Sequence, residues 1–383
     1  MRAKRGGVMA DERFYATVGV GVERIVSGEL QALGIRVART EPGRVRFEGS
    51  LDDLSRALIH LRCASRVVRE ILFQEVEREG DLYDVVRSID WSRWLTPDMT
   101  FRVALNAHSS LLRNSQFGVY RVKDAICDAM VERVGRRPSV DREAPDLHVA
   151  CYLENRRFSV GLDGAGTPLH MRGYRVGGHE SSLREHLAAA MLLQSRWDPA
   201  RPLHDPFCGS GTILIEAAMI ATHTPPSLWR KRFGCMSWPD FDRARFDGLR
   251  AEARAAITAD EGLRITGADR SRKAIESARA NVTAAGFDDV IRLRVRDVAE
   301  MTLESGSWVV TNPPYGVRVG DEETYKPVWN SFRDRLLGGP GAQVAVLAPE
   351  EGFEREFRMR PFKRNRMNNG PIRCVLSQYR IHE

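Results

Sequence analysis

A short loop at residues 312–315 combines the groups that chemistry on an exocyclic amine requires. It reads Asn312-Pro313-Pro314-Tyr315 and follows an apolar segment, 308–311, that is predicted to be a strand. Proline lacks a backbone N–H and stiffens the loop, so the Asn312 side-chain oxygen and the Pro313 carbonyl stay free as acceptors. Two fixed acceptors can hold both N–H groups of a base's amino group. Because that nitrogen is poorly nucleophilic, orienting it towards an electrophilic methyl group is the main catalytic task.

Tyr315 adds an aromatic ring that can stack on a base turned out of its helix. A purely structural proline-rich turn explains the two prolines, but it does not explain the asparagine, the tyrosine and the strand-end position together. The loop therefore predicts a catalytic set of Asn312, Pro313, Pro314 and Tyr315.

A glycine turn upstream predicts where the methyl donor binds. A short strand at 203–205 is followed by Gly209-Ser210-Gly211 and an apolar helix. A phosphate-binding P-loop requires Gly-Lys-Ser/Thr, whereas Thr212 follows the second glycine here. A dinucleotide site requires a third glycine and an acidic residue about 20 positions on, and this turn has neither. The remaining ligand is S-adenosylmethionine (SAM), with Asp205 placed to meet its amino group. The expected cofactor contacts come from the turn and its flanks: Asp205, Pro206, Gly209, Ser210, Gly211 and Thr212.

Acidic residues follow the next two predicted strands. Asp269 ends the segment 265–269 and can accept hydrogen bonds from the ribose hydroxyls of SAM, although a helix-capping role is the alternative. Asp297 follows the segment 291–296 and is placed to accept from the adenine amino group. Three carboxylates at successive strand ends behind a glycine turn indicate SAM, with S-adenosylhomocysteine (SAH) as the product. Asn312 is expected to contact the cofactor as well as the substrate.

Alternating strands and helices from residue 201 onward predict the framework for these residues. This order implies a parallel sheet with right-handed crossovers, whose ligands lie beyond the carboxyl ends of the strands. Further strands at 344–347 and 373–380 complete a Rossmann-like domain over residues 201–383. The segment 358–366 is strongly basic, and its part at 363–366 is expected to lie on an exposed loop. The insertion 223–261 interleaves basic and aromatic residues, which suits either RNA contact or a packed element with a basic rim.

The preceding chain predicts two α+β units and a joint. Residues 12–72 alternate strand and helix patterns and indicate a ferredoxin-like unit. Residues 73–165 contain a polar loop at 113–118, a helix at 122–134 and a closing hairpin. Residues 166–200 form a glycine-rich linker and a connecting helix, and Arg172, Tyr174 and Arg175 are hypothesised to face the substrate or the methionine end of the cofactor.

Composition narrows the class of protein. The 383 residues carry a net charge of +7, which favours a polyanionic partner. Six cysteines without a C-x-x-C pair and nine histidines without a ligand-like spacing predict no metal site and a reducing compartment. No apolar run reaches the length of a membrane span. Residues 1–11 are expected to be a disordered basic tail, since they lack the apolar core of a signal peptide. These features predict a cytoplasmic protein with no membrane association and no obligatory protein partner.

Several motifs in order resemble those of a known family. The segments 113–118, 122–126, 140–146 and 169–175 look like the THUMP domain of RNA-modifying enzymes. With the loop at 312–315, nearly the whole chain from residue 12 is similar to bacterial guanine-N2 methyltransferases that act on 23S ribosomal RNA. The resemblance implies that the two units at 12–72 and 73–165 bind structured RNA. The residues that would contact RNA are Arg113, Asn114, Lys123, Arg136, Arg137, Arg172 and Arg318, although several of these arginines suit a solvated face equally well.

The sequence thus predicts a ferredoxin-like unit, a THUMP domain and a Rossmann-like SAM-dependent methyltransferase. By resemblance, the expected reaction is methyl transfer to the N2 amine of a guanine, with 23S rRNA as the first choice of substrate. Some members of that family carry a second methyltransferase half that this sequence lacks, so the related tRNA guanine-N2 enzymes stay open. A DNA adenine-N6 methyltransferase is a further alternative, because the same loop suits any exocyclic amine. A non-catalytic RNA-binding protein is the alternative outside enzymes.

Overall fold

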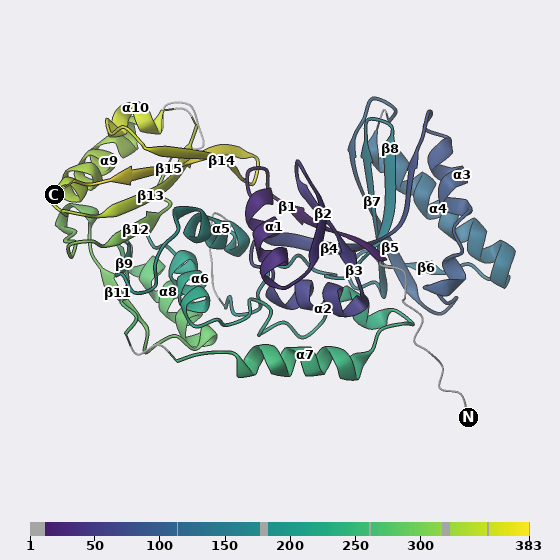
Figure 1. Ribbon diagram of the computed structural model, residues 1–383. Helices are drawn as coiled ribbons and strands as arrows, with labels where there is room; N and C mark the ends of the chain where they lie inside the picture. Colours follow the sequence, from purple (N-terminus) through teal and green to yellow (C-terminus); the bar gives the residue numbers. More distant parts are fainter. Residues whose placement is uncertain are drawn as a thin grey trace.

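Two β-sheets form the framework of the molecule and lie at opposite ends of it (Figure 1). The computed structural model describes residues 12–112, 114–176, 183–259, 262–315, 322–350 and 352–382. The expected tail at 1–11 and the candidate residues Arg113 and Arg318 lie outside these ranges. Among the described residues, no helix combines the length and the apolar character that crossing a bilayer requires.

The first sheet begins with a βαββαβ unit. Its elements are β1 (Glu12–Val18), α1 (Glu23–Ala32), β2 (Arg36–Glu41), β3 (Arg44–Gly49), α2 (Leu51–His60) and β4 (Ala64–Glu75). The sequence predicted neither β2 nor β4, and these two strands complete the order of a ferredoxin-like fold. A capping box explains why α2 begins at Leu51: the Ser50 hydroxyl accepts from the Asp53 N–H while the Asp53 carboxylate accepts from the Ser50 N–H.

The second unit continues the same sheet. Its elements are α3 (Asp81–Arg87), η1 (Trp91–Arg93), β5 (Thr100–His108), α4 (Ser115–Val134), β6 (Ser139–Val140), β7 (Leu147–Glu154) and β8 (Arg157–Asp163). Together the two units form one eight-stranded sheet in the order β2-β3-β1-β4-β8-β7-β5-β6. The expected boundary at residues 72/73 falls inside β4, which pairs with β1 on one side and β8 on the other. The polar loop expected at 113–118 is wrong from Ser115 onward, because α4 already begins there.

The second sheet has seven strands in the order β11-β10-β9-β12-β13-β15-β14. Its strands are β9 (Leu203–Asp205), β10 (Ile265–Asp269), β11 (Ile291–Val295), β12 (Trp308–Thr311), β13 (Gln343–Pro349), β14 (Lys363–Asn369) and β15 (Ile372–Arg380). The first five are parallel, and β15 runs antiparallel between β13 and β14. The exposed loop expected at 363–366 is wrong, because β14 begins at Lys363 and forms the edge of the sheet there.

Two apolar cores lie on the two faces of this sheet. One contains residues of α5 (Glu185–Ser195), α6 (Thr212–Ala221) and α8 (Arg272–Ala285), and the other is built on α9 (Glu322–Leu337) and α10 (Phe353–Phe357). The helix α5 belongs to the expected linker 166–200, yet it packs on this sheet: the Gln378 Nε2 of β15 donates to the Gln194 carbonyl at 3.3 Å. The segment between β11 and β12 forms only a short 3-10 turn, η3 (Val298–Glu300).

The insertion 223–261 joins the two ends of the molecule. It contains η2 (Gly234–Ser237) and α7 (Arg243–Ala255), which lies beside α2 of the first unit (Figure 1). Its Arg230 is buried and donates to the carbonyls of Ala165, Thr167, Pro168 and Met171 at 2.8–3.0 Å. This arginine therefore fixes the joint between the sheets, whereas the neighbouring Lys231 and Arg232 are exposed.

Candidate active site

The candidate site lies at the topological switch point of the second sheet, where consecutive strands begin to be added on the other side of β9. The chain runs outwards from β9 through β10 to β11 on one side, and returns to pair β12 with the other side of β9. In open parallel sheets this reversal leaves a crevice at the carboxyl ends of the strands, because the two connecting helices diverge to opposite faces. Asp205, Asp269 and Asn312 all lie at this edge, at or directly after the ends of β9, β10 and β12.

Asp205 is buried and links two of these strand ends. Only 1% of Asp205 is exposed to solvent. Its Oδ1 accepts hydrogen bonds from the Thr311 hydroxyl at 2.6 Å and from the Phe207 N–H at 3.1 Å. Burial raises the pKa of the Asp205 carboxyl to about 7, against the hydrogen bonds from Thr311 and Phe207 that lower it. Such a carboxyl gains charge readily when a cation arrives beside it.

The glycine turn has the conformation that its sequence predicts. Gly209 and Gly211 have φ angles of +51° and +80°, which other residues adopt with strain. A Cβ atom on Gly209 would meet no described atom within 4 Å, so the turn borders open space on that side. Gly211 is the N-cap of α6, and the helix begins at Thr212. The free N–H groups of that first turn suit a polar or anionic ligand group.

Two side chains outside the motif hold this turn in place. Arg175 donates to the Ser210 hydroxyl at 3.2 Å and to the Thr212 hydroxyl at 3.0 Å, and its Nε pairs with Glu185 at 2.9 Å. Asn281 of α8 donates its Nδ2 to the Ser210 carbonyl at 3.0 Å. The sequence placed Arg175 near the cofactor without a partner, and it did not single out Asn281. A polar residue on the apolar stripe of the helix at 272–285 was the available signal.

The other two carboxylates brace the loops in which they lie. The Asp269 Oδ2 accepts from the Gly209 N–H at 3.1 Å and its Oδ1 accepts from the Ser271 N–H at 2.8 Å. Ser271, not Asp269, is the N-cap of α8, which removes the capping alternative for Asp269. Asp297 is exposed beyond the end of β11, and its Oδ1 accepts from the Ala299 N–H at 2.9 Å.

The loop after β12 presents acceptors that no described residue uses. The Asn312 Oδ1 is buried and accepts no hydrogen bond. The Pro313 carbonyl likewise accepts none from the described residues. The Trp329 indole of α9 donates to the Pro314 carbonyl at 3.0 Å and thereby anchors the loop. A buried acceptor without a donor is unfavourable by about 1–3 kcal/mol, so the Asn312 oxygen can accept a hydrogen bond from a ligand at little cost.

Tyr315 is held by the hairpin of β14 and β15. Its ring is half-buried against both apolar cores, and its hydroxyl accepts from the Asn369 Nδ2 at 2.9 Å. Burial raises the pKa of Tyr315 to about 12. The hydroxyl is therefore a neutral anchor, and the role of the ring as a stacking surface stays a prediction.

The residues present fit SAM. The turn leaves open space beside Gly209, the buried Asp205 can charge against an amino group, and Asp269 and Asp297 follow at the next strand ends. When bound there, SAM supplies an electrophilic methyl group. Asp205, Ser210, Thr212 and the acids at the strand ends would hold it, next to the acceptors of the Asn312 loop.

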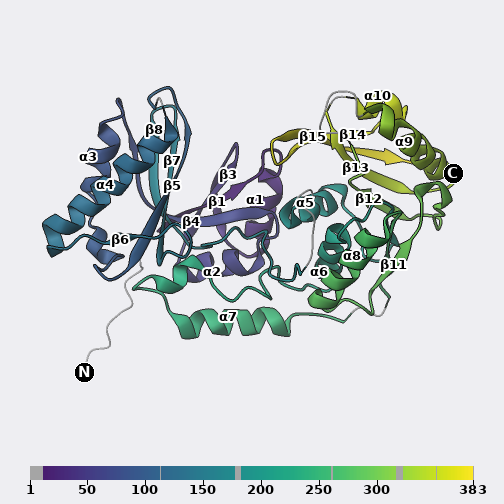
Figure 2. The ribbon, with the colours of Figure 1, turned by 180° about the vertical axis from the view of Figure 1, so that it is seen from behind.

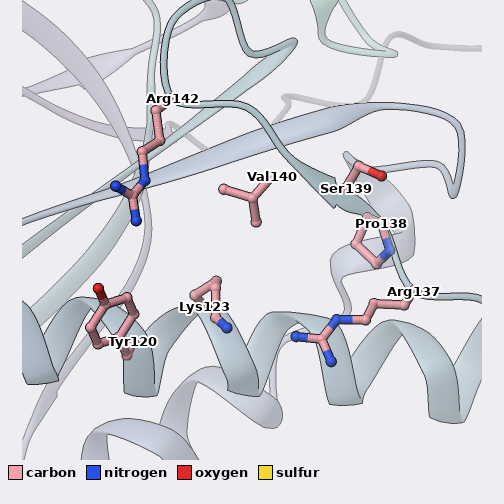
Figure 3. A pocket seen from close by; sticks show the side chains of 7 residues that line it. All are labelled: Tyr120, Lys123, Arg137, Pro138, Ser139, Val140 and Arg142. Atoms are coloured by element: carbon pink, nitrogen blue, oxygen red, sulfur yellow. The ribbon is translucent and has the colours of Figure 1, made fainter.

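The residues that the sequence assigned to RNA contact are scattered. Asn114 caps α4 by accepting from the Gln116 N–H, and Arg136 pairs with Asp98 at 2.9 Å. Lys123 and Arg137 lie 2.6 and 3.6 Å from Asp124. Lys123 and Arg137 also line a hollow of about 670 Å³ between α4 and β6, together with Tyr120, Arg142 and Val140 (Figure 3).

The assignment of Arg172 to RNA or substrate contact is wrong. Only 1% of Arg172 is exposed to solvent. Its guanidinium pairs with the buried Glu216 at 3.0 Å and donates to the carbonyls of Arg62 and Leu169. Tyr174 is also buried, with its ring packed edge-on against Trp229. Of the three residues hypothesised to face the ligand, only Arg175 reaches the cofactor turn.

Comparison with known proteins gives matches along the whole chain. Residues 172–378 match the model of the RMKL-like methyltransferase domain, residues 13–68 match the RlmL ferredoxin-like domain, and residues 76–163 match the THUMP domain. Among solved structures, a predicted N6-adenine-specific DNA methylase from Listeria monocytogenes is 30% identical, with a TM-score of 0.86 and 98% of each chain covered. A possible methylase from Clostridium difficile is 27% identical, with a TM-score of 0.89, over 97% of this chain and 99% of that one.

The match to SMU.472, a putative methyltransferase complexed with SAH, bears on the cofactor. It is 28% identical, with a TM-score of 0.86, over 97% of this chain and 98% of that one. The fold and the site thus define a SAM-dependent methyltransferase of the Rossmann-like class, with SAM as its cofactor. The chain belongs to the RMKL-like methyltransferase family, with a ferredoxin-like and a THUMP domain in front of the catalytic domain.

Proposed function

We propose that the protein transfers a methyl group from SAM to the exocyclic N2 amine of a guanine in structured RNA, with 23S rRNA as the preferred substrate. The observation that supports an exocyclic amine as the methyl acceptor is a pair of oxygens after β12 that no described residue uses as hydrogen-bond acceptors. Asn312 Oδ1 is buried without a donor, and the Pro313 carbonyl lies one residue further on. An amino group offers two N–H donors, which match these two oxygens. Holding both fixes the nitrogen for in-line attack and supplies the orientation that a delocalised amine needs.

The THUMP domain supports RNA as the polymer. It presents the hollow between α4 and β6, where Lys123, Arg137 and Arg142 gather beside the exposed ring of Tyr120 (Figure 3). Arginine and lysine neutralise phosphates, and an exposed tyrosine offers a stacking face, so this surface has the chemistry of an RNA-binding hollow. The choice of guanine N2 as the methylated atom rests on the family resemblance, and tRNA is the alternative RNA substrate.

A DNA adenine-N6 methyltransferase is the second candidate. One structural relative, at 30% identity over 98% of both chains, carries that predicted activity in its description. The Asn312 loop accepts an adenine amine as well as a guanine amine, so the site chemistry alone is common to both.

Incubation with labelled SAM and separate pools of rRNA, tRNA and genomic DNA tests the proposal. Label is expected in the rRNA pool, and digestion should yield N2-methylguanosine. N2-methylguanosine in tRNA would move the substrate to the alternative. N6-methyladenine in DNA would overturn the proposal in favour of the second candidate.

An Asn312→Ala variant tests the role of the loop. It is expected to lower kcat by at least about 100-fold, because the amine loses one of its two fixed acceptors. SAM affinity by calorimetry should stay within a few-fold. Asn330→Ala, on the exposed side of α9, is the matched control. Full activity of the Asn312→Ala variant would remove Asn312 from the catalytic set.

A further inference from the structure

One face of the catalytic sheet carries no helix over its first three strands. The segment between β11 and β12 forms only η3 and a loop, so no described helix covers this face of β9, β10 and β11. The opposite face is covered by α6 and α8, since a Cβ on Gly267 of β10 would touch Leu214 of α6. Side chains alternate along a strand, so residues next to Gly267 and Leu293 point to the uncovered face.

The uncovered face forms a groove of about 340 Å³. Its floor holds His204 of β9, Thr266 of β10, and Arg292 and Arg294 of β11. Thr266 pairs in register with both His204 and Arg292, which confirms that these side chains share one face. The wall is the segment 298–307, and one end of the groove reaches Pro206 and Asp297 of the candidate cofactor site.

Positive charge dominates the β11 side of this groove. Arg292, Arg294 and Arg296 recur at every second residue, so neighbouring members are about 6.6 Å apart along the chain. The guanidinium groups of Arg294 and Arg296 make no hydrogen bond or ion pair with any described residue, while Arg292 donates to the Asp288 carbonyl at 2.8 Å. Arg264, at the far end of the groove, is neutralised by Glu304 at 2.8 Å. The three arginines, none of them in an ion pair with a described residue, thus lie in a row along β11 and the residue directly after it.

We propose that this groove binds the phosphate backbone of the RNA substrate, a proposal that rests on the function proposed above. A row of arginines without ion pairs to described residues suits the repeating charges of a nucleic-acid strand, and guanidinium groups contact phosphate oxygens with two N–H groups at once. We call the row Arg292, Arg294 and Arg296 the β11 arginine row.

The position of the row defines the kind of RNA. The strand β11 lies at the opposite end of the molecule from α4 and β6, which flank the basic hollow, in both views (Figures 1 and 2). An RNA that contacts both spans the whole length of the enzyme. This favours a large structured RNA over a short stem-loop as the natural substrate.

The test compares an Arg292→Ala/Arg294→Ala double variant with an Arg254→Ala/Arg279→Ala control. Arg254 on α7 and Arg279 on α8 are exposed and make no hydrogen bond or ion pair through their side chains among the described residues, so the control removes the same charge elsewhere. The probe is a transcript of the RNA that the wild-type protein methylates in the pooled assay. Its affinity is measured from 50 to 300 mM KCl, alongside SAM affinity by calorimetry.

Two lost phosphate contacts should weaken RNA binding about 10- to 30-fold near 0.15 M salt and lower the slope of log K against log salt by about 1.4 to 1.8. SAM affinity should match the wild type, and the control should bind RNA as the wild type does. An unchanged RNA affinity and salt slope in the test variant would overturn the groove proposal. Equal losses in test and control would overturn it too, because the effect would then reflect net charge. A wild-type protein that methylates none of the RNA pools would instead refute the proposed function.

Discussion

At the scale of single residues, Asp205 connects the cofactor site with the catalytic loop. Asp205 is the last residue of β9, and its carboxylate accepts a hydrogen bond from the Thr311 hydroxyl. Thr311 is the last residue of β12 and directly precedes Asn312. This hydrogen bond links the end of β9 directly to the loop after β12. Burial raises the pKa of this carboxyl from 3.8 to about 7, so the free enzyme carries it partly protonated near neutral pH.

SAM affinity is expected to rise with pH because of this carboxyl. The cationic amino group of SAM favours the ionised acid and lowers its pKa in the complex, so binding below about pH 7 releases a proton. The dissociation constant should fall by up to about tenfold per pH unit between pH 5.5 and 7 and level off above pH 7.5. Calorimetry over that range, in buffers of different ionisation heat, measures both the affinity and the proton release.

An Asp205→Asn variant serves as the control for this titration. It should bind SAM weakly and without the pH dependence. The sign for stability is opposite: a carboxyl whose folded pKa is raised is protonated in the folded state, so its contribution to stability declines as pH rises from about 4 to 7. A SAM affinity that is flat from pH 5.5 to 7.5 in the wild type would contradict the assignment of Asp205 to the amino group.

Individual residues were predictable where a backbone rule constrains them and unpredictable where burial decides. The glycines of the turn and the acid at each strand end follow from the order of strand, turn and helix. Arg172 and Arg230 stand in basic stretches that the sequence cannot distinguish from a surface, because a guanidinium is buried only when carbonyls and carboxylates from distant segments surround it. For Arg172 those partners are Glu216, Arg62 and Leu169, which lie up to 110 positions away.

At the scale of elements, the glycine turn depends on groups from outside it. Arg175 approaches from the segment before α5 and Asn281 from α8, and both bind Ser210. These contacts replace solvent with fixed partners, so the turn is held in the shape that leaves Gly209 open to the ligand.

Removing the arginine brace should weaken cofactor binding. In an Arg175→Ala variant, Ser210 and Thr212 lose a charged donor, and Glu185 loses its partner. We expect SAM affinity to fall by about tenfold, on the order of 1.4 kcal/mol. Because Arg175 acts through the turn, KM for SAM should rise while kcat at saturating SAM changes little.

Arg184→Ala provides the comparison for this variant, since Arg184 is an exposed arginine in the same segment. Steady-state kinetics with varied SAM distinguish the two. A fall in kcat without a change in KM would contradict a positioning role for Arg175.

The sequence predicted most strands but missed β2, β4, β6 and β14. The segment Lys363–Asn369 contains no β-branched or aromatic residue, yet it forms β14 because it pairs along its length with β15. Its charged residues suit a sheet edge, where lysine and arginine discourage pairing with other chains. The strand β2 is an edge strand of the same kind, rich in arginine and paired only with β3. Low propensity does not explain every missed strand, because β2 contains Val37 and Thr40 and β4 contains Val67, Val68 and Ile71.

At the scale of the whole molecule, a buried ionic network fastens the first sheet to the catalytic domain. The Arg62 guanidinium donates to the carbonyls of Met219 and Thr224 at 3.1 and 2.8 Å, while its carbonyl accepts from Arg172 at 2.6 Å. Arg172 in turn pairs with Glu216 on α6, the helix that begins at the cofactor turn. The front domains are thereby held at a fixed distance from the catalytic loop, which favours substrates of fixed shape.

Breaking the pair inside this network should destabilise the protein, and replacing both partners should not. A Glu216→Leu variant leaves a buried guanidinium uncompensated, and an Arg172→Met variant leaves a buried carboxylate; each is expected to lower the free energy of unfolding by about 3–5 kcal/mol. The double variant Arg172→Met/Glu216→Leu should recover most of that loss, because apolar side chains of similar volume need no partner.

Urea unfolding followed by circular dichroism and by tryptophan fluorescence measures the change. Coincident transitions by the two probes are expected in the wild type, since the network makes the two sheets one cooperative unit. A single-variant loss below about 1 kcal/mol would show that the pair contributes no more than an exposed salt bridge and that the joint is held by Arg230 and α7 instead.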